Sequence, residues 1–393
     1  MRLVDVAEFY SEFGGGVKTY VHHKLEACAN AGVEATIIAP GPADRRERRL
    51  GGEIIWVKSP VIPFDHRYWL FADSKPVHGL LDEIKPDIIE GSSTWRGAWI
   101  AANWRGAAAR ALFLHQDPVA VYPQSLLSPF VRAQTVDAAF GWFWFYLRKL
   151  ASRFDATVVP SQWYATRLRE RRVADAVVRP LGVNKAVFSH ELRDEALRRE
   201  MLAACGVDDP DAILFVTVGR HHIEKRLPMV FDAFQRISAK RAAGLYVIGD
   251  GPMWRTVSSA ARRAPGVFVA GVERDRGMLA RRFASADYLV HGGAAETFGL
   301  VVAEALSSGL PIIAPDTGGA TDMCHPAFSE TYRAGDSRAL GDAIERMLTR
   351  DRASLSLAAR AGAKRLCTPE EHFAALLELY GNLADGRRQR RAA

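Results

Sequence analysis

Two carboxylates, Glu296 and Glu304, stand near a stretch that favours anion binding. An apolar segment ending at Val290 runs into a loop of small residues at 292–294, and a helix is predicted to open near Phe298. The first N–H groups of a helix have no partner inside it, so those of residues 297–300 suit a phosphate. Two acids placed before and inside such a helix could face one polar ligand from two sides. The pattern predicts a site for a ligand that carries both phosphates and hydroxyls.

Two cations form a second candidate group. Arg220 and Lys225 follow residues 213–218, a continuous apolar run typical of a buried parallel strand. Cations at the end of such a strand would offset the charge of a pyrophosphate and stabilise it as it leaves. The alternative is that both are surface charges on a loop.

The elements that must position these residues alternate along the chain. Strand-like segments and amphipathic helical segments follow one another in both halves, which predicts parallel, doubly wound sheets of the α/β class. Ligands bind such sheets beyond the carboxyl ends of the strands, where the chain order reverses. In the first half we expect strands at 2–10, 34–39, 53–58, 87–90, 111–115 and 155–160, helices at 17–30, 75–84 and 95–109, and a loop at 59–69. In the second half we expect strands at 213–218, 245–248, 267–271, 287–291 and 311–315, and helices at 194–205, 337–349 and 369–384.

The run Glu296-Thr297-Phe298-Gly299, followed by Glu304, resembles the signature E-[ST]-F-G-x-x-x-x-E of the retaining glycosyltransferases of family 4. The resemblance implies the GT-B fold, in which two Rossmann-like domains face each other across a cleft. It implies that a nucleotide-sugar donor binds mainly to the second domain and the acceptor mainly to the first.

The resemblance also assigns roles to residues. Glu304 would accept hydrogen bonds from the ribose hydroxyls and Glu296 from those of the donor sugar, while Arg220 and Lys225 would neutralise the diphosphate. The candidate catalytic residues are then Glu296, His115, Arg220 and Lys225. The candidate donor-binding residues are Gly15, Gly16, Arg220, Lys225, Val272, Thr297, Phe298, Gly299, Leu300 and Glu304.

Three of these positions depend on the resemblance more than on their own pattern. A triple glycine ending at Gly16 is by itself usually a tight turn, but a glycine loop in this place lines the cleft of the family. His115 ends a strand and would by itself be structural; in the family a histidine there lies next to the donor sugar. Val272 follows a strand where the family holds the nucleotide base.

The expected domains are residues 1–185, joined by a crossover helix at 369–384, and residues 186–368, with a disordered basic tail at 385–393. A chain of 393 residues has room for two cores. Its four cysteines are far apart and form no zinc-binding or disulfide pattern, which favours a reducing cytosol. Neither a signal sequence nor an apolar run long enough to span a membrane is apparent.

The net charge is +7, and arginines cluster at 45–49, 167–172 and 387–391. We interpret them as a solvated basic face or as attraction to an anionic membrane, and we discount nucleic acid because no recognition motif accompanies them. Residues 134–150 are rich in aromatic side chains. They are either a buried core helix or an element that lies at a lipid boundary.

Together these features predict a glycosyltransferase that moves a sugar from a UDP- or GDP-type donor to a glycan or lipid acceptor, with retention of configuration. We expect no metal and no cofactor, and we interpret Asp209-Pro210-Asp211 as a polar loop. The alternatives are an epimerase or inverting transferase of the same fold, or a non-catalytic partner protein that binds a nucleotide sugar.

Overall fold

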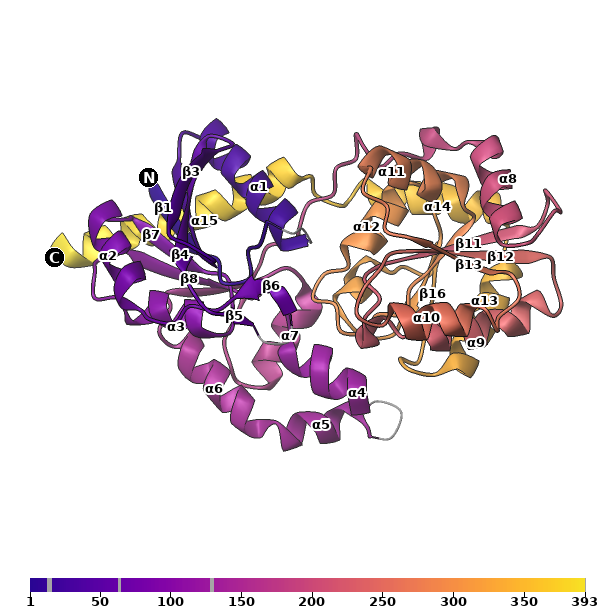
Figure 1. Ribbon diagram of the computed structural model, residues 1–393, viewed down its shortest axis with the longest axis horizontal. Helices are drawn as coiled ribbons and strands as arrows, with labels where there is room; N and C mark the ends of the chain where they lie inside the picture. Colours follow the sequence, from indigo (N-terminus) through magenta and orange to yellow (C-terminus); the bar gives the residue numbers. More distant parts are fainter. Residues whose placement is uncertain (13–15, 63–64, 128–130, 393) are drawn as a thin grey trace. The chain divides into compact units, whose positions relative to one another are not determined.

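The computed structural model describes residues 1–12, 16–62, 65–127 and 131–392. The chain divides into two compact units, and both are α/β with parallel sheets, as the sequence predicts (Figure 1). Unit 1 contains Met1–Gln116, Phe140–Pro180 and Pro369–Ala393, and unit 2 contains Asp117–Ala139 and Leu181–Thr368. These units differ from the expected domains in two stretches, because Asp117–Ala139 and residues 181–185 belong to unit 2.

The sheet of unit 1 has the strand order β10-β9-β8-β7-β1-β2-β4-β3, and only β3 is antiparallel to its neighbour. The chain leaves β1 toward β2 and later returns to β7 on the other side, so the order reverses between β1 and β7. The strands are β1 (Arg2–Val6), β2 (Glu34–Gly41), β3 (Arg45–Arg49), β4 (Gly52–Lys58), β7 (Ile88–Gly91), β8 (Ala109–Phe113), β9 (Ala156–Val159) and β10 (Val177–Val178).

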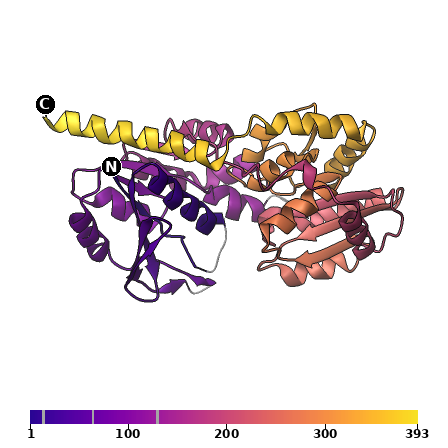
Figure 2. The ribbon, with the colours of Figure 1, turned by 90° about the horizontal axis from the view of Figure 1, so that it is seen from above.

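Helices cover both faces of this sheet. Apolar residues of α2 and α3 pack against β1, β2 and β7 in one core, while α15 packs on α1, β7 and β8. Figure 2 shows α15 as a long helix that runs alongside unit 1. The helices of unit 1 are α1 (Gly16–Asn30), α2 (Lys75–Ile84), α3 (Arg96–Asn103), α6 (Gly141–Ala151), α7 (Gln162–Glu170) and α15 (Pro369–Ala392).

The sheet of unit 2 is wholly parallel, with the order β13-β12-β11-β14-β15-β16. Its strand order reverses between β11 and β14, and apolar runs form its strands because both faces are covered. The strands are β11 (Ile213–Val218), β12 (Ala243–Ile248), β13 (Val267–Gly271), β14 (Tyr288–Val290), β15 (Ile312–Pro315) and β16 (Ser329–Tyr332).

Two apolar cores hold the helices of unit 2, one on each face of the sheet. Helices α8, α11, α12 and α14 contribute to one core, and α9, α10 and α13 to the other (Figure 1). The helices are α8 (Glu195–Ala204), α9 (Leu227–Ser238), α10 (Trp254–Ala261), α11 (Arg276–Ser285), α12 (Leu300–Ser307), α13 (Ser337–Leu348) and α14 (Arg352–Ala363). The segment from the first half adds a π-helical turn (η1, Ala120–Gln124), α4 (Ser125–Leu127) and α5 (Ala133–Ala139).

The arginine cluster at 45–49, for which the sequence predicted no element, forms β3, an edge strand whose side chains are exposed or half-buried. Other local expectations were wrong. The loop expected at 59–69 contains a hairpin of β5 (Val61–Ile62) and β6 (Asp65–Trp69). The helix expected at 134–150 is interrupted at Phe140, which separates α5 from α6.

The disordered basic tail expected at 385–393 was also wrong, because helix α15 continues through Ala392. Arg388 explains part of this extension: it forms ion pairs with Asp87 at 2.6 Å and with Asp385 at 3.1 Å. Among the residues in the described ranges, no helix is both long and apolar enough to cross a membrane.

A buried ionic network ties α1, β1, β7 and α15 together. Lys24 Nζ lies 2.6 Å from Asp5 Oδ2 and 2.7 Å from Glu90 Oε1, and all three side chains are buried. Tyr380 of α15 donates its hydroxyl hydrogen to Glu90 Oε2 at 2.8 Å. Burial, together with the nearby Asp5, raises the pKa of Glu90 to about 7. Two carboxyl groups therefore share one lysine in the centre of unit 1.

We expect Lys24→Met to destabilise the protein by about 3–5 kcal/mol at pH 8, because it leaves two buried carboxyl groups without their cation. Urea unfolding measures the loss, and Lys240→Met, at an exposed pair with Glu345, is the control with a loss below about 1 kcal/mol. The defect should shrink at pH 5, because the pKa of Glu90 is raised to about 7 and this carboxyl group is then protonated. A loss that is the same at both pH values would show that packing, and not charge, is the cause.

Candidate functional site

The two predicted cations and the small-residue loop follow neighbouring strands of unit 2. Arg220 and Lys225 come after β11, and Gly292 and Gly293 come after β14. These strands pair with each other at the point where the strand order reverses. The carboxyl ends of strands at such a point form the usual ligand-binding edge of an open α/β sheet.

Lys225 and Glu296 form an ion pair at this edge. Lys225 Nζ donates to Glu296 Oε1, and the two side chains are only 13% and 14% exposed. Burial lowers the pKa of Lys225, because a desolvated ammonium group favours its neutral form. Arg220, by contrast, lies at an exposed position one residue after Gly219.

Glycines around Lys225 leave the room that the pair requires. A Cβ atom on Gly292 would lie 2.2 Å from the carbonyl oxygen of Lys225, and one on Gly293 would lie 3.3 Å from its Cδ atom. A Cβ atom on Gly219, whose φ is +155°, would lie 3.4 Å from the Cε atom of Lys225, which is ordinary van der Waals contact. The small-residue loop of the sequence is therefore the surface on which Lys225 packs.

His291 is a neighbour of this pair that the sequence analysis did not assign to the site. Its Nε2 atom lies 3.3 Å from Glu296 Oε2, and Tyr332 donates a hydrogen bond to its carbonyl oxygen at 2.8 Å. Burial, together with the charge of Lys225, lowers the pKa of His291 to about 3. His291 is therefore neutral at physiological pH and does not compete with Lys225 for the carboxylate.

Helix α12 starts two residues later than predicted, at Leu300, and Gly299 precedes it with φ +95°. The turn before it is closed by a hydrogen bond of 2.6 Å from Gly319 N to Glu296 O. A Cβ on Gly319 would lie 2.1 Å from the carbonyl oxygen of Thr297, so this position requires glycine. Phe298, within this turn, is buried in the core of unit 2 and so anchors the turn.

Glu304 lies inside α12 and is 5% exposed. Arg276, the first residue of α11, donates from Nη2 to Glu304 Oε1 at 2.6 Å, and its guanidinium lies 4.8 Å from the ring centre of Phe188. Burial raises the pKa of Glu304, and Arg276 opposes that rise. Arg276 was missed by the sequence analysis because nothing in its local pattern points to a glutamate in another helix.

Val272 follows β13 and is 58% exposed, so its side chain is open to a ligand. The next residue, Glu273, forms an ion pair with Arg282 at 3.0 Å. The stretch Asp117–Ala139, which comes from the first half of the sequence, also reaches the site. Ala120 and Val121 pack against Ala295, next to Glu296.

The remaining predicted residues lie in unit 1 and are described separately. Gly16 is the first residue of α1, whereas Gly15 lies outside the described residues. His115 follows β8, stacks on Phe113 with ring centres 4.1 Å apart, and meets Tyr20 edge-on at 4.7 Å. Burial lowers the pKa of His115 well below its usual range, so its imidazole is neutral.

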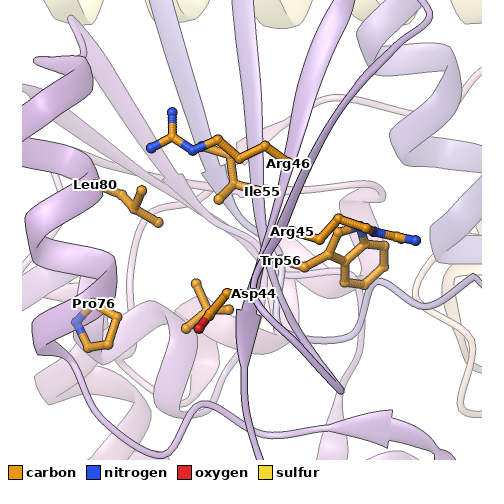
Figure 3. A pocket seen from close by; sticks show the side chains of 8 residues that line it. Asp44, Arg45, Arg46, Ile55, Trp56, Pro76 and Leu80 are labelled. Carbon is orange, nitrogen blue, oxygen red and sulfur yellow. The ribbon is translucent and has the colours of Figure 1, made fainter.

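A cavity of about 450 Å³ opens in unit 1 beside β3, β4 and α2 (Figure 3). Arg45 lies over the ring of Trp56 at 5.3 Å, and Arg46 forms an ion pair with Glu83 at 2.8 Å. None of the residues predicted to bind donor or acceptor lines this cavity, so we assign it no role in the site. Its lining residues are Asp44, Arg45, Arg46, Ile55, Trp56, Val57, Pro76 and Leu80.

Comparison with known proteins shows the family to which the chain is related. The model of the family described as "Glycosyltransferase Family 4" matches residues 14–187, and that described as "Glycosyl transferases group 1" matches residues 212–350. A GDP-mannose-dependent alpha-mannosyltransferase of Mycobacterium tuberculosis is 32% identical over 378 residues, covering 92% of this chain and 91% of that protein. A GDP-mannose-dependent alpha-(1-6)-phosphatidylinositol dimannoside mannosyltransferase of the same species is 27% identical and covers 94% of this chain and 96% of that protein.

The fold has close counterparts among solved structures. A sucrose-phosphate synthase from Thermosynechococcus elongatus superimposes with a TM-score of 0.78 at 19% identity, covering 98% of this chain and 100% of that chain. Fold and sequence together define a nucleotide-sugar glycosyltransferase with the GT-B fold. More narrowly, the chain belongs to glycosyltransferase family 4, the family that its glutamate signature indicates.

We expect stability to fall as the pH drops below about 6.5, partly because of His291. The unfolded chain takes up a proton on this histidine near pH 6.5, whereas the folded protein does so only near its lowered pKa of about 3. Between pH 7 and pH 5 the histidine should therefore cost about 2 kcal/mol of stability, which His291→Asn should remove. Urea unfolding at both pH values tests this, and an identical pH dependence of the two proteins would contradict it.

Proposed function

We propose that this chain transfers mannose from GDP-mannose to a hydroxyl group of a glycan or lipid acceptor, with retention of the anomeric configuration. The observation that carries the proposal is the Lys225–Glu296 pair at the carboxyl edge of β11 and β14. This pair offers a cation to a diphosphate and a carboxylate to sugar hydroxyls. The names of the relatives support mannose and guanosine as the sugar and base of the donor.

Each side chain has a role in holding the donor. Lys225 and Arg220 neutralise the diphosphate, and the first N–H groups of α12 assist them. Glu296 accepts hydrogen bonds from the hydroxyls of the mannose. Glu304 accepts hydrogen bonds from the ribose hydroxyls, and Arg276, which donates to Glu304 Oε1, shares this carboxylate with the ribose. Val272 lies beside the base.

Catalysis then consists mainly of positioning and of stabilising the charge of the departing diphosphate. The acceptor hydroxyl attacks from the side that the diphosphate leaves, and the leaving phosphate oxygen takes the proton. We assign no protein base to this step. Because Arg220 and Lys225 supply the positive charge, we propose that the reaction requires no metal and no cofactor. His115, on unit 1, is proposed to contact the donor sugar as a neutral hydrogen-bonding group.

The alternatives differ in their products. An inverting transferase would give the opposite anomer, an epimerase would change the sugar nucleotide without an acceptor, and a non-catalytic partner would bind the donor and consume none. Incubation of the protein with GDP-mannose and an acceptor such as methyl α-D-mannopyranoside, with analysis of the products by NMR, separates the three from the proposed reaction. We expect an α-mannoside.

Lys225→Ala should weaken binding of GDP by about tenfold or more and lower the rate of transfer by about 100-fold or more, because a charge-assisted contact to phosphate is lost. Glu304→Gln should weaken the binding of GDP, because Glu304 is assigned to the ribose. It should have less effect on the contacts with the mannose, which are assigned to Glu296. Isothermal titration calorimetry with GDP, UDP and ADP gives the affinities. Lys240→Ala, which removes an exposed lysine of the same unit, is the control. Wild-type affinity in the Lys225 variant would end the assignment, and tighter binding of UDP would replace the guanosine.

We also propose that the protein acts at the cytoplasmic face of an anionic membrane, which α6 contacts. Trp142 and Phe145 are 63% and 62% exposed, and the exposed Lys149 follows them on the same helix. Aromatic and basic side chains along one stripe suit the boundary between lipid tails and head groups. Trp144 does not belong to this stripe, because it is 4% exposed and lies under Arg167.

Trp142→Ala/Phe145→Ala should lose most of the binding to phosphatidylcholine vesicles that contain phosphatidylinositol, because the double variant removes the apolar part of the stripe. Co-sedimentation measures the bound fraction. Leu357→Ala, at a residue of α14 that is 64% exposed, is the matched control and should bind like the wild type. Equal sedimentation of all three proteins, or none by any of them, would exclude this role of α6.

A further inference from the structure

Glu8 lies at the place in unit 1 that corresponds to the donor site in unit 2. The strand order of unit 1 reverses between β1 and β7, and Glu8 follows β1 by two residues. The loop after β7 supplies its partners: Ser93 Oγ donates to Glu8 Oε2 at 2.9 Å, and Gly97 N donates to the same oxygen at 3.0 Å. A reversal point in an open α/β sheet is where ligands bind.

The other carboxylate oxygen of Glu8 is unused. The residue is 1% exposed, and its Oε1 atom is buried without a hydrogen-bond partner among the described residues. Burial raises the pKa of Glu8, although Gly97, Ser93 and Arg96 oppose the rise. A buried carboxylate oxygen without a donor is costly, so its retention calls for an explanation by a ligand.

The acids inside the neighbouring strands differ from Glu8, because each contacts a cation. Asp5 on β1 and Glu90 on β7 share the ammonium group of Lys24, and Glu90 also accepts from Tyr380. Glu8 has no ion pair within the part of the chain that the structure describes. The fold thus neutralises the acids inside the sheet but leaves one at its carboxyl edge with an open acceptor.

The loop that holds Glu8 also carries an exposed aromatic ring. Trp95 lies between Ser93 and Gly97. Its backbone N–H donates to Ser93 Oγ at 3.3 Å, and the residue is 37% exposed. A sugar ring or a cyclitol presents hydroxyls at its edge and C–H groups on its faces. A carboxylate oxygen accepts from the hydroxyls, and an indole packs on the C–H face.

We propose that Glu8 and Trp95 form the subsite of unit 1 that binds the sugar or cyclitol ring of the acceptor, with a ring hydroxyl donating to Glu8 Oε1. The identification of this ligand as the acceptor rests on the proposed transferase function. Ser93 and Gly97 act as positioning groups, because their two hydrogen bonds fix one oxygen and leave the other directed to the ligand.

Glu8→Gln tests the subsite with the full chain. The glutamine oxygen can still accept from Ser93 and Gly97, whereas the amide nitrogen presents hydrogens where the ligand hydroxyl must donate. We expect the affinity for methyl α-D-mannopyranoside or myo-inositol, measured by saturation-transfer NMR, to fall about tenfold or more. Trp95→Ala should weaken the same binding. Glu83→Gln, at an exposed acid of α2, is the control and should bind like the wild type.

The melting temperature and the affinity for GDP separate the possible failures. Glu8→Gln should keep both, since Lys225, Arg220 and Glu304, the residues assigned to the diphosphate and ribose of GDP, lie in unit 2. Unchanged binding of both probes by Glu8→Gln would overturn the proposal, as would a wild type that binds neither probe. If the wild type binds a probe through Glu8 but binds no GDP, the subsite stands and the transferase function of the chain fails.

Discussion

Both units depend on an ion pair between a lysine and carboxyl groups that have little contact with solvent. In unit 1, Lys24 is enclosed completely and is shared by two carboxyl groups. In unit 2, Lys225 meets Glu296 at the edge of the sheet, where both side chains keep a small exposed fraction. The same type of pair is structural in the first place and accessible in the second. Its position along the strands, and not its chemistry, makes the difference.

The geometry of the proposed donor site depends on glycines that pack closely against its residues. The position of Lys225 at the carboxyl edge requires glycine at 292, because a Cβ atom there would lie 2.2 Å from the carbonyl oxygen of Lys225. The turn before α12 likewise depends on Gly319. These positions hold the ammonium group and the first N–H groups of α12 at the same edge. A loop that looks permissive in sequence is therefore tightly constrained in space.

The sequence predicted what depends on local pattern. Strands such as β11 and β13, helix α2 and the edge that carries Lys225 and Glu296 follow from apolar runs and turn residues. Contacts between distant segments could not be predicted in this way. Arg276 pairs with Glu304 across two helices, Arg388 pairs with Asp87 across nearly the whole chain, and Ala120 reaches Ala295 from the other half. The partners of exposed arginines are another example: Arg46 of β3 pairs with Glu83 of α2, which the sequence could not indicate.

Unit 1 is discontinuous, because α15, which packs on its sheet, follows residues 181–368 in the sequence. During synthesis the strands of unit 1 emerge first, yet the face covered by α15 stays open until that helix has been made. Tyr20 and Glu90 lack their partners His372 and Tyr380 throughout that interval. Domains usually fold in the order of their synthesis. Unit 1 is therefore made first but completed last. The surface that α15 covers stays exposed on the nascent chain while residues 181–368 are made.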